Sequence, residues 1–517
     1  MASLVLEVKV IGEYMCRMRV MSKCLLAVII LWTCVACRET PRDEAVRNKT
    51  EFSTVSSAES SAVQVFPEWY TGAVNEKGLD VYFDAKVVGT NDAVSRVEVS
   101  PRILTQDMAD RIIAALIGDS DIYANDPVVG AAYTREFYLD QITGLKILLG
   151  DEEFQKDANQ VASANAMVSD YEALMMSAPS EESLPPTERV FVPYRTPENM
   201  YVVDESSLGG MSDEEKEEIL RWHEEMNRRA GQLTGDEVIS GHIRMGKDQY
   251  AALDIMKAEN PFCSFVYFSN KSRDEGAVVT SPGNLTEIAV DGERLESPDL
   301  DAASVCAEET LRSMQIGDYT LSRAGFCVSS HGVGDEKVYS FFFAPGMSGV
   351  SSQYVCNEQI QSSFAGNDVA FEEVWKQEYI QIDVSRGSVV GFYWNSPSEI
   401  EAAGSERVGL LPFQEVMRLA EQQFKNEYIY PLGEDVVRNE IHISEIVLSM
   451  MKVKERDSGA YAYKPVWDFV GYTNHEYAEG SQLLLDSDGK CVVSNFCESF
   501  LTLDAATGAR ISRISGY

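Results

Sequence analysis

Basic residues are scarce in this chain of 517 residues, which has 44 Lys and Arg, 82 Asp and Glu, and a formal net charge of −38 at pH 7. Proteins that bind nucleic acids or anionic surfaces present patches of positive charge to them. The charge balance therefore argues against nucleic acid and against an anionic surface as the ligand. It indicates instead an acidic, well-solvated protein surface.

The common catalytic and nucleotide-binding motifs are also missing. The chain has no G-x-S-x-G nucleophile elbow, no P-loop and no glycine fingerprint of a dinucleotide-binding fold. Its histidines are few and lack the spacing of metal ligands. The sequence therefore predicts no catalytic residues, no cofactor and no metal site. The histidines are His223, His242, His331, His442 and His475.

Three partial motifs each lack an essential member. His223-Glu-Glu-Met-Asn227 ends in Asn where a zinc protease needs its second histidine. Ser449-Met-Met-Lys452 fits the S-x-x-K pattern of some serine nucleophiles, but it lies in a predicted strand and no K-T-G follows. Asp486-Ser-Asp-Gly489 lacks the later ligands of a calcium loop, so we interpret it as a hairpin turn.

Near the N-terminus, the apolar run from Leu25 to Trp32 is too short to cross a membrane, because a spanning helix needs about 20 apolar residues. Arg17, Arg19 and Lys23 precede this run, and a cysteine follows it. A positive region followed by a short apolar core is typical of a signal peptide. Residues before Met15 fit neither region, so we expect translation to start at Met15, Met18 or Met21.

Cys34-Val-Ala-Cys37 resembles the bacterial lipobox, in which small residues precede a cysteine that is diacylated and becomes the new N-terminus. A Leu usually stands three residues before the acylated cysteine, and Cys34 takes its place here. The resemblance implies removal of residues 1–36, a lipid on Cys37, and anchorage at the outer face of the bacterial cytoplasmic membrane. An ordinary secretory signal cleaved near Ala36 is the alternative.

The stretch after Cys37 is polar, rich in Ser and Thr, and without periodicity. We therefore predict that residues 37–63 form a flexible tether and that the folded part begins near Val65. Downstream cysteines have no C-x-x-C spacing, which argues against zinc. They could form three disulfides in an exported protein or remain buried free thiols. These cysteines are Cys263, Cys306, Cys327, Cys356, Cys491 and Cys497.

The folded part is longer than one hydrophobic core usually serves, so we expect two or three domains. Residues 64–295 are predicted to form an N-terminal α+β domain. Its strands alternate apolar and polar residues at 79–88, at 94–99 and again after Glu237. Apolar residues at three- and four-residue spacing predict a helical hairpin over residues 134–176, hinged at Gly150.

The C-terminal part contains an internal repeat. Each copy begins with an amphipathic helix, at Ala303 to Met314 and at Pro412 to Phe424, and continues with strand patterns. Each copy ends in D-x-x-x-G between strands, where Asp is expected to cap the turn and Gly to adopt φ > 0. The copies span residues 296–400 and 401–517, and the turn residues are Asp383, Gly387, Asp504 and Gly508.

A helix followed by antiparallel strands and a D-x-x-T-G hairpin resembles the PepSY-type module of peptidase propeptides and secreted regulatory proteins. Tyr463-Lys-Pro-Val-Trp-Asp-Phe469 is similar to the P-V-W-x-F strand of such modules and of YycH and YycI, extracytoplasmic regulators of a cell-wall sensor kinase. The whole chain also resembles uncharacterised lipoproteins of Gram-positive gut bacteria. These resemblances imply a binding or regulatory role and bring no catalytic residues. YycH and YycI keep a transmembrane anchor where a lipid is expected here, so the resemblance alone does not imply their kinase partnership for this chain.

The sequence thus predicts an α+β fold of antiparallel sheets with packed helices. The predicted function is that of a membrane-anchored extracytoplasmic lipoprotein, acting as a non-catalytic binding or regulatory module for an envelope protein or peptide. One alternative is a solute-binding lipoprotein of a transporter, which would need alternating β and α elements with parallel buried strands. Another is a cell-envelope hydrolase, which would need a deep cleft with converging Asp, Glu or His residues.

Overall fold

The computed structural model describes residues 66–123, 134–195, 233–355, 377–427, 436–477 and 490–516, with short gaps inside these ranges and a few further residues between 216 and 221. The predicted signal peptide, Cys37 and the whole of the predicted tether lie outside them. The chain divides into two compact units. In the part that the structure describes, no helix combines the length and the apolar character that crossing a membrane requires.

The smaller unit contains two helices that contact each other along their length. Lys146 Nζ lies 2.8 Å from Glu172 Oε1, and the rings of Tyr138 and Tyr171 have centroids 5.9 Å apart. The second helix begins at Ala158, later than the sequence predicts. The elements are α4 (Arg135–Leu149), the 3₁₀ turn η2 (Phe154–Lys156) and α5 (Ala158–Ser177).

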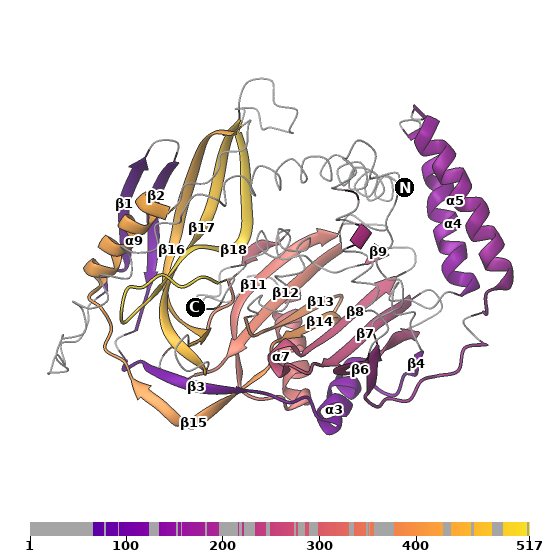
Figure 1. Cartoon of the computed structure of the whole chain (residues 1–517), viewed down its shortest axis with the longest axis horizontal. Coiled ribbons are helices and arrows are strands. Elements are labelled where there is room, and N and C mark those ends of the chain that lie inside the picture. Colours follow the sequence, from indigo (N-terminus) through magenta and orange to yellow (C-terminus); the bar gives the residue numbers. More distant parts are fainter. Residues whose placement is uncertain are drawn as a thin grey trace. The chain divides into compact units, whose positions relative to one another are not determined.

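The larger unit contains two sheets, of which sheet A has the order β1-β2-β16-β17-β3-β15, with β18 also paired to β17. Its described ladders are antiparallel except for β2 and β16, which run parallel. Figure 1 shows β16, β17 and β18 as long, curved strands. The strands are β1 (Trp69–Glu76), β2 (Leu79–Val88), β3 (Ser95–Pro101), β15 (Ser398–Arg407), β16 (Val436–Lys454), β17 (Tyr461–Tyr477) and β18 (Lys490–Asp504).

Helix α9 (Phe413–Glu427) packs on one face of sheet A, beside β1 and β2 in Figure 1. Phe413, Val416 and Phe424, which share the apolar face of the predicted amphipathic helix, are all buried in this core. Burying a large apolar side chain contributes about 1.5–3 kcal/mol, so this face holds the helix in place. Trp467 of β17 is fully buried in the same core.

Sheet B has the order β10-β11-β12-β13-β14-β8-β7-β6-β4, with β5 on β6 and β9 on β8. Helices α3 and α7 share its core, and the Thr105 hydroxyl caps α3 by accepting from the Met108 N–H at 3.3 Å. The elements are α3 (Gln106–Ile117), α7 (Pro298–Met314), β4 (Ile122–Tyr123), β5 (Val192–Arg195), β6 (Leu233–Arg244), β7 (Gln249–Lys257), the 3₁₀ turn η5 (Pro261–Cys263), β8 (Phe265–Ser272), β9 (Gly276–Ala277), β10 (Thr286–Ile288), β11 (Tyr319–Ser329), β12 (Glu336–Pro345), β13 (Tyr379–Ser385) and β14 (Ser388–Asn395).

The two sheets contact each other within the larger unit. Phe342 of β12 stacks on Tyr354 with ring centroids 4.1 Å apart, and both share an apolar cluster with Val470 of β17. Arg323 of β11 forms an ion pair with Glu445 of β16. Sheet A is therefore covered by α9 on one face and contacts sheet B on the other.

The observed helices and mostly antiparallel sheets confirm the predicted α+β class. Three features were not predicted. β2 and β16 form a parallel pair, whereas antiparallel sheets were expected. β1 and β15 are strands in segments to which the sequence assigned none. Sheet B also joins segments placed in different predicted domains, because β14 pairs with β8.

Candidate functional site

An open groove of about 740 Å³ lies between helix α9 and the first part of β1. Phe66, Pro67 and Tyr70 line it from the β1 side. The start of α9 supplies the other side, and we call the whole the α9–β1 groove. Its residues from that side are Pro412, Phe413, Gln414, Met417, Arg418 and Glu421.

Aromatic contacts hold the two sides of the groove together. The Phe66 ring lies 6.3 Å from Phe413 and 5.4 Å from Trp467, and Tyr70 lies 6.1 Å from Phe413, all edge-to-face. Such pairs contribute about 0.5–1.5 kcal/mol each beyond the burial of area. Pro412 precedes the helix, where its fixed φ suits the first turn. The start of α9 is therefore firmly placed against β1.

The groove carries one carboxylate without an ion-pair partner among the described residues. The Tyr70 hydroxyl donates to Glu421 at 3.0 Å. Burial raises the pKa of Tyr70 to about 12, and Glu421 adds to the rise, so the phenol remains a donor at neutral pH. Arg418 is held by Glu415 instead, through hydrogen bonds of 2.7 and 2.9 Å. The negative charge of Glu421 is thus available to a ligand.

Trp467 lies against the groove lining. Its ring contacts Phe66 and Phe413, and it is fully buried. Its indole N–H has no hydrogen-bond partner among the residues that the structure describes. A buried donor without a partner costs about 1–3 kcal/mol, so an acceptor that reached it would bind favourably.

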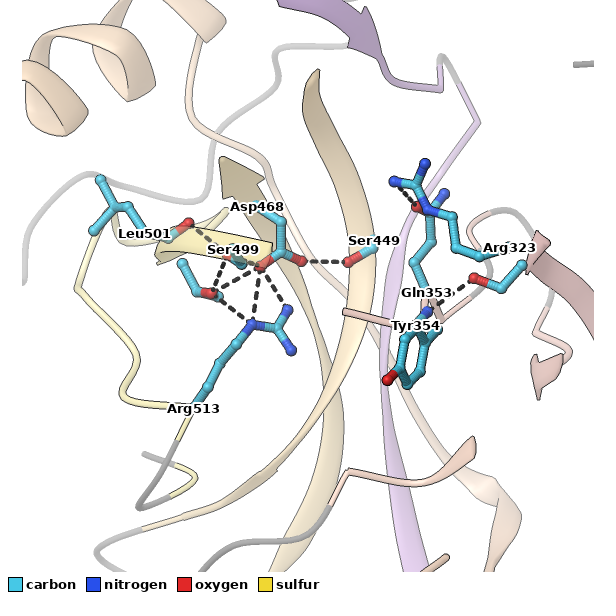
Figure 2. A network of polar contacts seen from close by, with 10 residues as sticks. Arg323, Gln353, Tyr354, Ser449, Asp468, Ser499, Leu501 and Arg513 are labelled. Atoms are coloured by element: carbon cyan, nitrogen blue, oxygen red, sulfur yellow. Dashed lines mark hydrogen bonds and ion pairs between the residues drawn. The ribbon is translucent and has the colours of Figure 1, made fainter. Parts of the chain in front are cut away.

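A buried polar network surrounds Asp468 on the face of sheet A opposite α9 (Figure 2). One carboxylate oxygen accepts from Ser449 at 2.9 Å, and the other accepts from Thr502 at 2.7 Å and from Arg513 Nη2 at 2.5 Å. Ser499 adds a further bond of 3.2 Å. Asp468 and Ser449 are 1% exposed, and Arg513 is 9% exposed. The network attaches the C-terminal segment to the sheet and offers no access to a substrate.

The S-x-x-K pattern is not a catalytic pair. Ser449 bonds to Asp468, whereas Lys452 Nζ donates to the Ser396 hydroxyl at 2.6 Å and to its carbonyl at 2.8 Å. Residues three apart in a strand point to opposite faces, which separates the two side chains. Burial lowers the pKa of Lys452 to about 8, and the negative charge of Glu378 opposes this shift.

Glu378 accepts hydrogen bonds from three strands of the two sheets. Its donors are Tyr319 of β11 at 2.6 Å, Tyr463 of β17 at 3.0 Å, and both the N–H and the hydroxyl of Ser398 in β15. Burial raises the pKa of Tyr319 and of Tyr463 well above the usual value, and Glu378 adds to both rises. Both carboxylate oxygens of Glu378 accept from protein donors, and the group is buried. Because these donors come from both sheets, Glu378 links sheet A to sheet B.

The two predicted turns are built differently. Arg386 and Gly387 have φ of 49° and 74°, as the two central residues of a type I′ turn do between β13 and β14. Asp383 lies inside β13, opposite Gly391, and accepts from Gln381 Nε2 at 3.0 and 3.2 Å. Asp383 therefore lies in the strand before the turn and does not occupy the capping position that the sequence predicted.

Asp504 does cap its own turn. Its carboxylate accepts from the N–H groups of Ala506 and Thr507, each at 2.9 Å, and Gly508 has a φ of 72°. The chain after Gly508 forms a single bridge, between Arg510 and Leu503, rather than another strand. Similar sequence patterns have therefore produced a two-residue hairpin in one case and an Asp-capped turn in the other.

Among the described residues, the cysteines and histidines form no reactive cluster. Cys263, Cys306, Cys327 and Cys497 remain thiols, which rules out three disulfides among the six cysteines; Cys356 and the side chain of Cys491 lie outside the described residues. His442 is stacked between Tyr82 and Tyr472, with ring centroids 5.2 and 4.8 Å away. In the described part of the chain, no three His, Cys, Asp or Glu side chains are placed to hold a metal ion.

Sequence reasoning placed Phe413 and Met417 correctly on an apolar helix face but missed Phe66, Tyr70 and Glu421. Only the tertiary fold brings β1 to α9, so no local pattern could have identified the groove. Comparisons of the chain with protein-family models, curated proteins and solved structures find no match. The α9–β1 groove is therefore a candidate site on its own geometry: a concave surface that can bind and that presents no nucleophile with a base.

Proposed function

We propose that the protein is a lipid-tethered extracytoplasmic module that binds a protein or peptide in the α9–β1 groove. The observation that best supports this is the groove itself, which combines aromatic walls with the carboxylate of Glu421, a group that accepts from Tyr70 and has no ion-pair partner among the described residues. Binding sites are typically concave, about 300–1,000 Å³ in volume, mostly apolar, and supplied with a few polar groups. The buried groups at Asp468, Glu378 and Lys452 are bonded within the protein and are unsuited to this task.

The tether is part of this proposal. Cys37 would carry the lipid, and residues 37–63 would separate the folded part from the outer face of the cytoplasmic membrane. The groove is well placed for such a tether in one respect, since Phe66 and Pro67 line it directly after the tether ends. A ligand in the groove would then be held near the membrane surface.

The PepSY-type resemblance also belongs to the proposal. Helix α7 is followed by β11 to β14, and α9 is followed by β16 to β18, each set pairing in chain order. This order supports two related units at residues 296–400 and 401–517. The different turns at Gly387 and Gly508 mark where the units diverge.

The two alternative functions find less support. A solute-binding lipoprotein would show repeated βα units with parallel strands. Among ladders whose register is described, only β2 with β16 is parallel. A hydrolase would need converging catalytic groups, and the residues lining the groove include a single Glu in contact with Tyr70.

Site-specific photo-crosslinking in cells of the source organism tests the proposal. A photoreactive amino acid replaces Gln414, which is exposed and lines the groove. The matched control replaces Glu308, an exposed residue of α7. We expect an adduct of one discrete mass at position 414 and none at 308.

The adduct at position 414 should also disappear in the background of Glu421→Lys, which reverses the charge of the half-buried carboxylate in the groove. Equal labelling at 414 and 308, or no adduct at 414, would refute the groove as the binding site. A product that comprises only a second copy of this chain would replace partner binding with self-association.

A further inference from the structure

Strand β1 is at the edge of sheet A and pairs only with β2 among the described strands. The Glu68 carbonyl accepts from the Val87 N–H at 3.0 Å, which makes residues 68 and 87 a hydrogen-bonded antiparallel pair. Hydrogen-bonded and non-bonded pairs alternate along such a ladder. The backbone N–H and C=O groups of Trp69, Thr71 and Ala73 therefore point away from β2, along the open edge.

The side chains of β1 alternate in step with this pattern. Tyr70 and Val74 face the core under α9, whereas Trp69, Thr71 and Ala73 are exposed on the other face. An extended chain that paired with the open edge would continue the same alternation. Every second side chain of that chain would then point to the α9 side of the sheet, where the groove lies.

The charges of the groove indicate which side chains would fit. Glu421 has no ion-pair partner within 4 Å among the described residues, and Arg418, which lines the same groove, is paired with Glu415. The chain as a whole carries a net charge of −38. Complementary charge raises association rates and selects partners, so a basic ligand is favoured.

We infer, resting on the proposed function, that the ligand is an extended, basic peptide segment that adds to β1 as a further strand. Its backbone pairs with the outward groups of Trp69, Thr71 and Ala73. An apolar side chain enters the groove beside Phe413 and Met417. A Lys or Arg two or four residues away pairs with Glu421. Edge addition of this kind takes its affinity from the main chain and its specificity from alternate side chains.

The probe is a library of random linear peptides of about ten residues, long enough for one strand, displayed on phage and selected on the purified protein. We expect the enriched sequences to carry Lys or Arg and apolar residues at alternating positions. Enrichment of acidic sequences, or of sequences without alternation, would overturn the inference. An enriched peptide is then synthesised and its binding followed by fluorescence polarisation.

Thr71→Pro tests the strand pairing. It removes an outward N–H while leaving the ladder between β1 and β2 intact, because proline is tolerated on the open side of an edge strand. We expect the variant to bind the peptide at least about tenfold more weakly, and the control Thr71→Val, which keeps the N–H, to stay within about twofold of wild type. Equal binding by all three proteins would exclude strand addition.

Methylating backbone amides of the peptide also tests its strand pairing with β1, and it uses the wild-type protein. This experiment therefore tests strand addition even if the Thr71→Pro variant does not fold. Methylating alternate amides in the register that faces β1 should abolish binding, and methylating the other register should leave it within about twofold. Equal loss in both registers would contradict an extended, edge-paired ligand.

Glu421→Gln tests the charge, since glutamine still accepts from Tyr70. We expect about fivefold weaker binding and a flatter dependence on NaCl concentration, because screening acts on the removed charge. Unchanged affinity would remove the basic residue from the inference.

Other occupants are distinguished in the same series. If residues 38–63 occupied the edge, deleting them would strengthen peptide binding; if a second copy did, sedimentation would show a dimer that Thr71→Pro dissociates. Either result overturns the inference. A crosslink at Gln414 in cells, together with no effect of Thr71→Pro or of methylation, would keep the proposed function and reject only strand addition.

Discussion

Lys452 shows how a single residue can make stability depend on pH. It is fully buried, with the Phe262 ring 5.0 Å from its amine and Ser396 accepting two hydrogen bonds. Burial lowers its pKa from 10.5 to about 8, with Glu378 and Cys263 opposing the shift. Between about pH 8 and pH 10.5 the Lys452 amine is largely protonated in the unfolded chain and largely neutral in the folded one. The unfolded chain therefore binds more protons, and the free energy of unfolding increases as the pH rises through this interval.

We therefore expect wild-type protein to gain stability from about pH 8 upward relative to Lys452→Met. A shift of this size corresponds to about 3 kcal/mol over the whole interval, and Tyr319 and Tyr463, whose pKa values are raised, act in the opposite direction above pH 10. Urea unfolding of both proteins at pH 7, 8 and 9.5 measures the difference. Parallel stability curves for the two proteins would show that Lys452 does not titrate in this range.

Gly387 and Gly508 should respond unequally to a side chain, although the sequence pattern predicts φ > 0 for both. Both have positive φ, but a Cβ at Gly387 meets nothing within 4 Å, whereas one at Gly508 would clash with Leu419 Cδ1. Gly387→Ala should cost about 1 kcal/mol of unfolding free energy, from backbone strain alone. Gly508→Ala should cost more, about 1–2 kcal/mol, because the end of the Leu419 side chain must also move. Chemical denaturation provides the values, and Gly387→Asn, which tolerates this φ, is the control.

Among the elements, the segment after β18 is held by one buried ion pair. Arg513 donates to Asp468 through Nη2 and Nε, and Ile511 packs with Met451 and Val466 on the same face of sheet A. Removing one member of a buried pair leaves the other charge without compensation. The C-terminal segment is therefore expected to be part of the folding unit and not an appendage.

Asp468→Asn should destabilise the protein by about 3–5 kcal/mol, because Arg513 stays buried and charged. The double variant Asp468→Asn, Arg513→Met should be less unstable than the sum of its single variants by about 1–3 kcal/mol. Urea unfolding of the four proteins completes the cycle. Additive losses within about 0.5 kcal/mol would mean that the pair is not coupled.

Elements with strong periodicity could be predicted from the sequence, and those that depend on distant partners could not. Helix α9 and strands β16 and β17 carry clear apolar patterns, and the structure shows them in the expected segments. β15 contains Glu, Ala and Gly, which disfavour strands, and exists because it pairs with β3. β1 likewise depends on its ladder with β2.

The candidate site could be predicted only in part for the same reason. The sequence identified the buried face of α9, including Phe413, but a groove needs its second wall, and Tyr70 lies far away in the chain. The turn at Asp383 was misjudged because D-x-x-x-G does not specify which residue stands in the turn. A two-residue loop at Arg386 and Gly387 shortens the hairpin and leaves Asp383 in the strand.

For the whole molecule, the proposed anchor predicts where the protein is found. Wild-type protein should sediment with membranes, because acyl chains contribute about 0.8 kcal/mol for each buried CH₂. Cys37→Ala should release it into the soluble fraction, while the folded part keeps its unfolding temperature. Fractionation of cells followed by immunodetection measures this, and unchanged membrane association of the variant would refute lipid anchoring.

The parallel pairing of β2 with β16 has a consequence for how the chain folds as it emerges. Leu79 is opposite Asn439, so one partner appears early and the other only after most of the chain has been made. Until then β2 can pair only with β1, and Val81 and Phe83, which end fully or almost fully buried, have no core to cover them. Closing so long a loop slows folding and leaves an apolar strand open to wrong pairings. The β1–β2 hairpin must therefore stay undocked or be shielded until synthesis is nearly complete, and chains that stop before β16 are expected to aggregate.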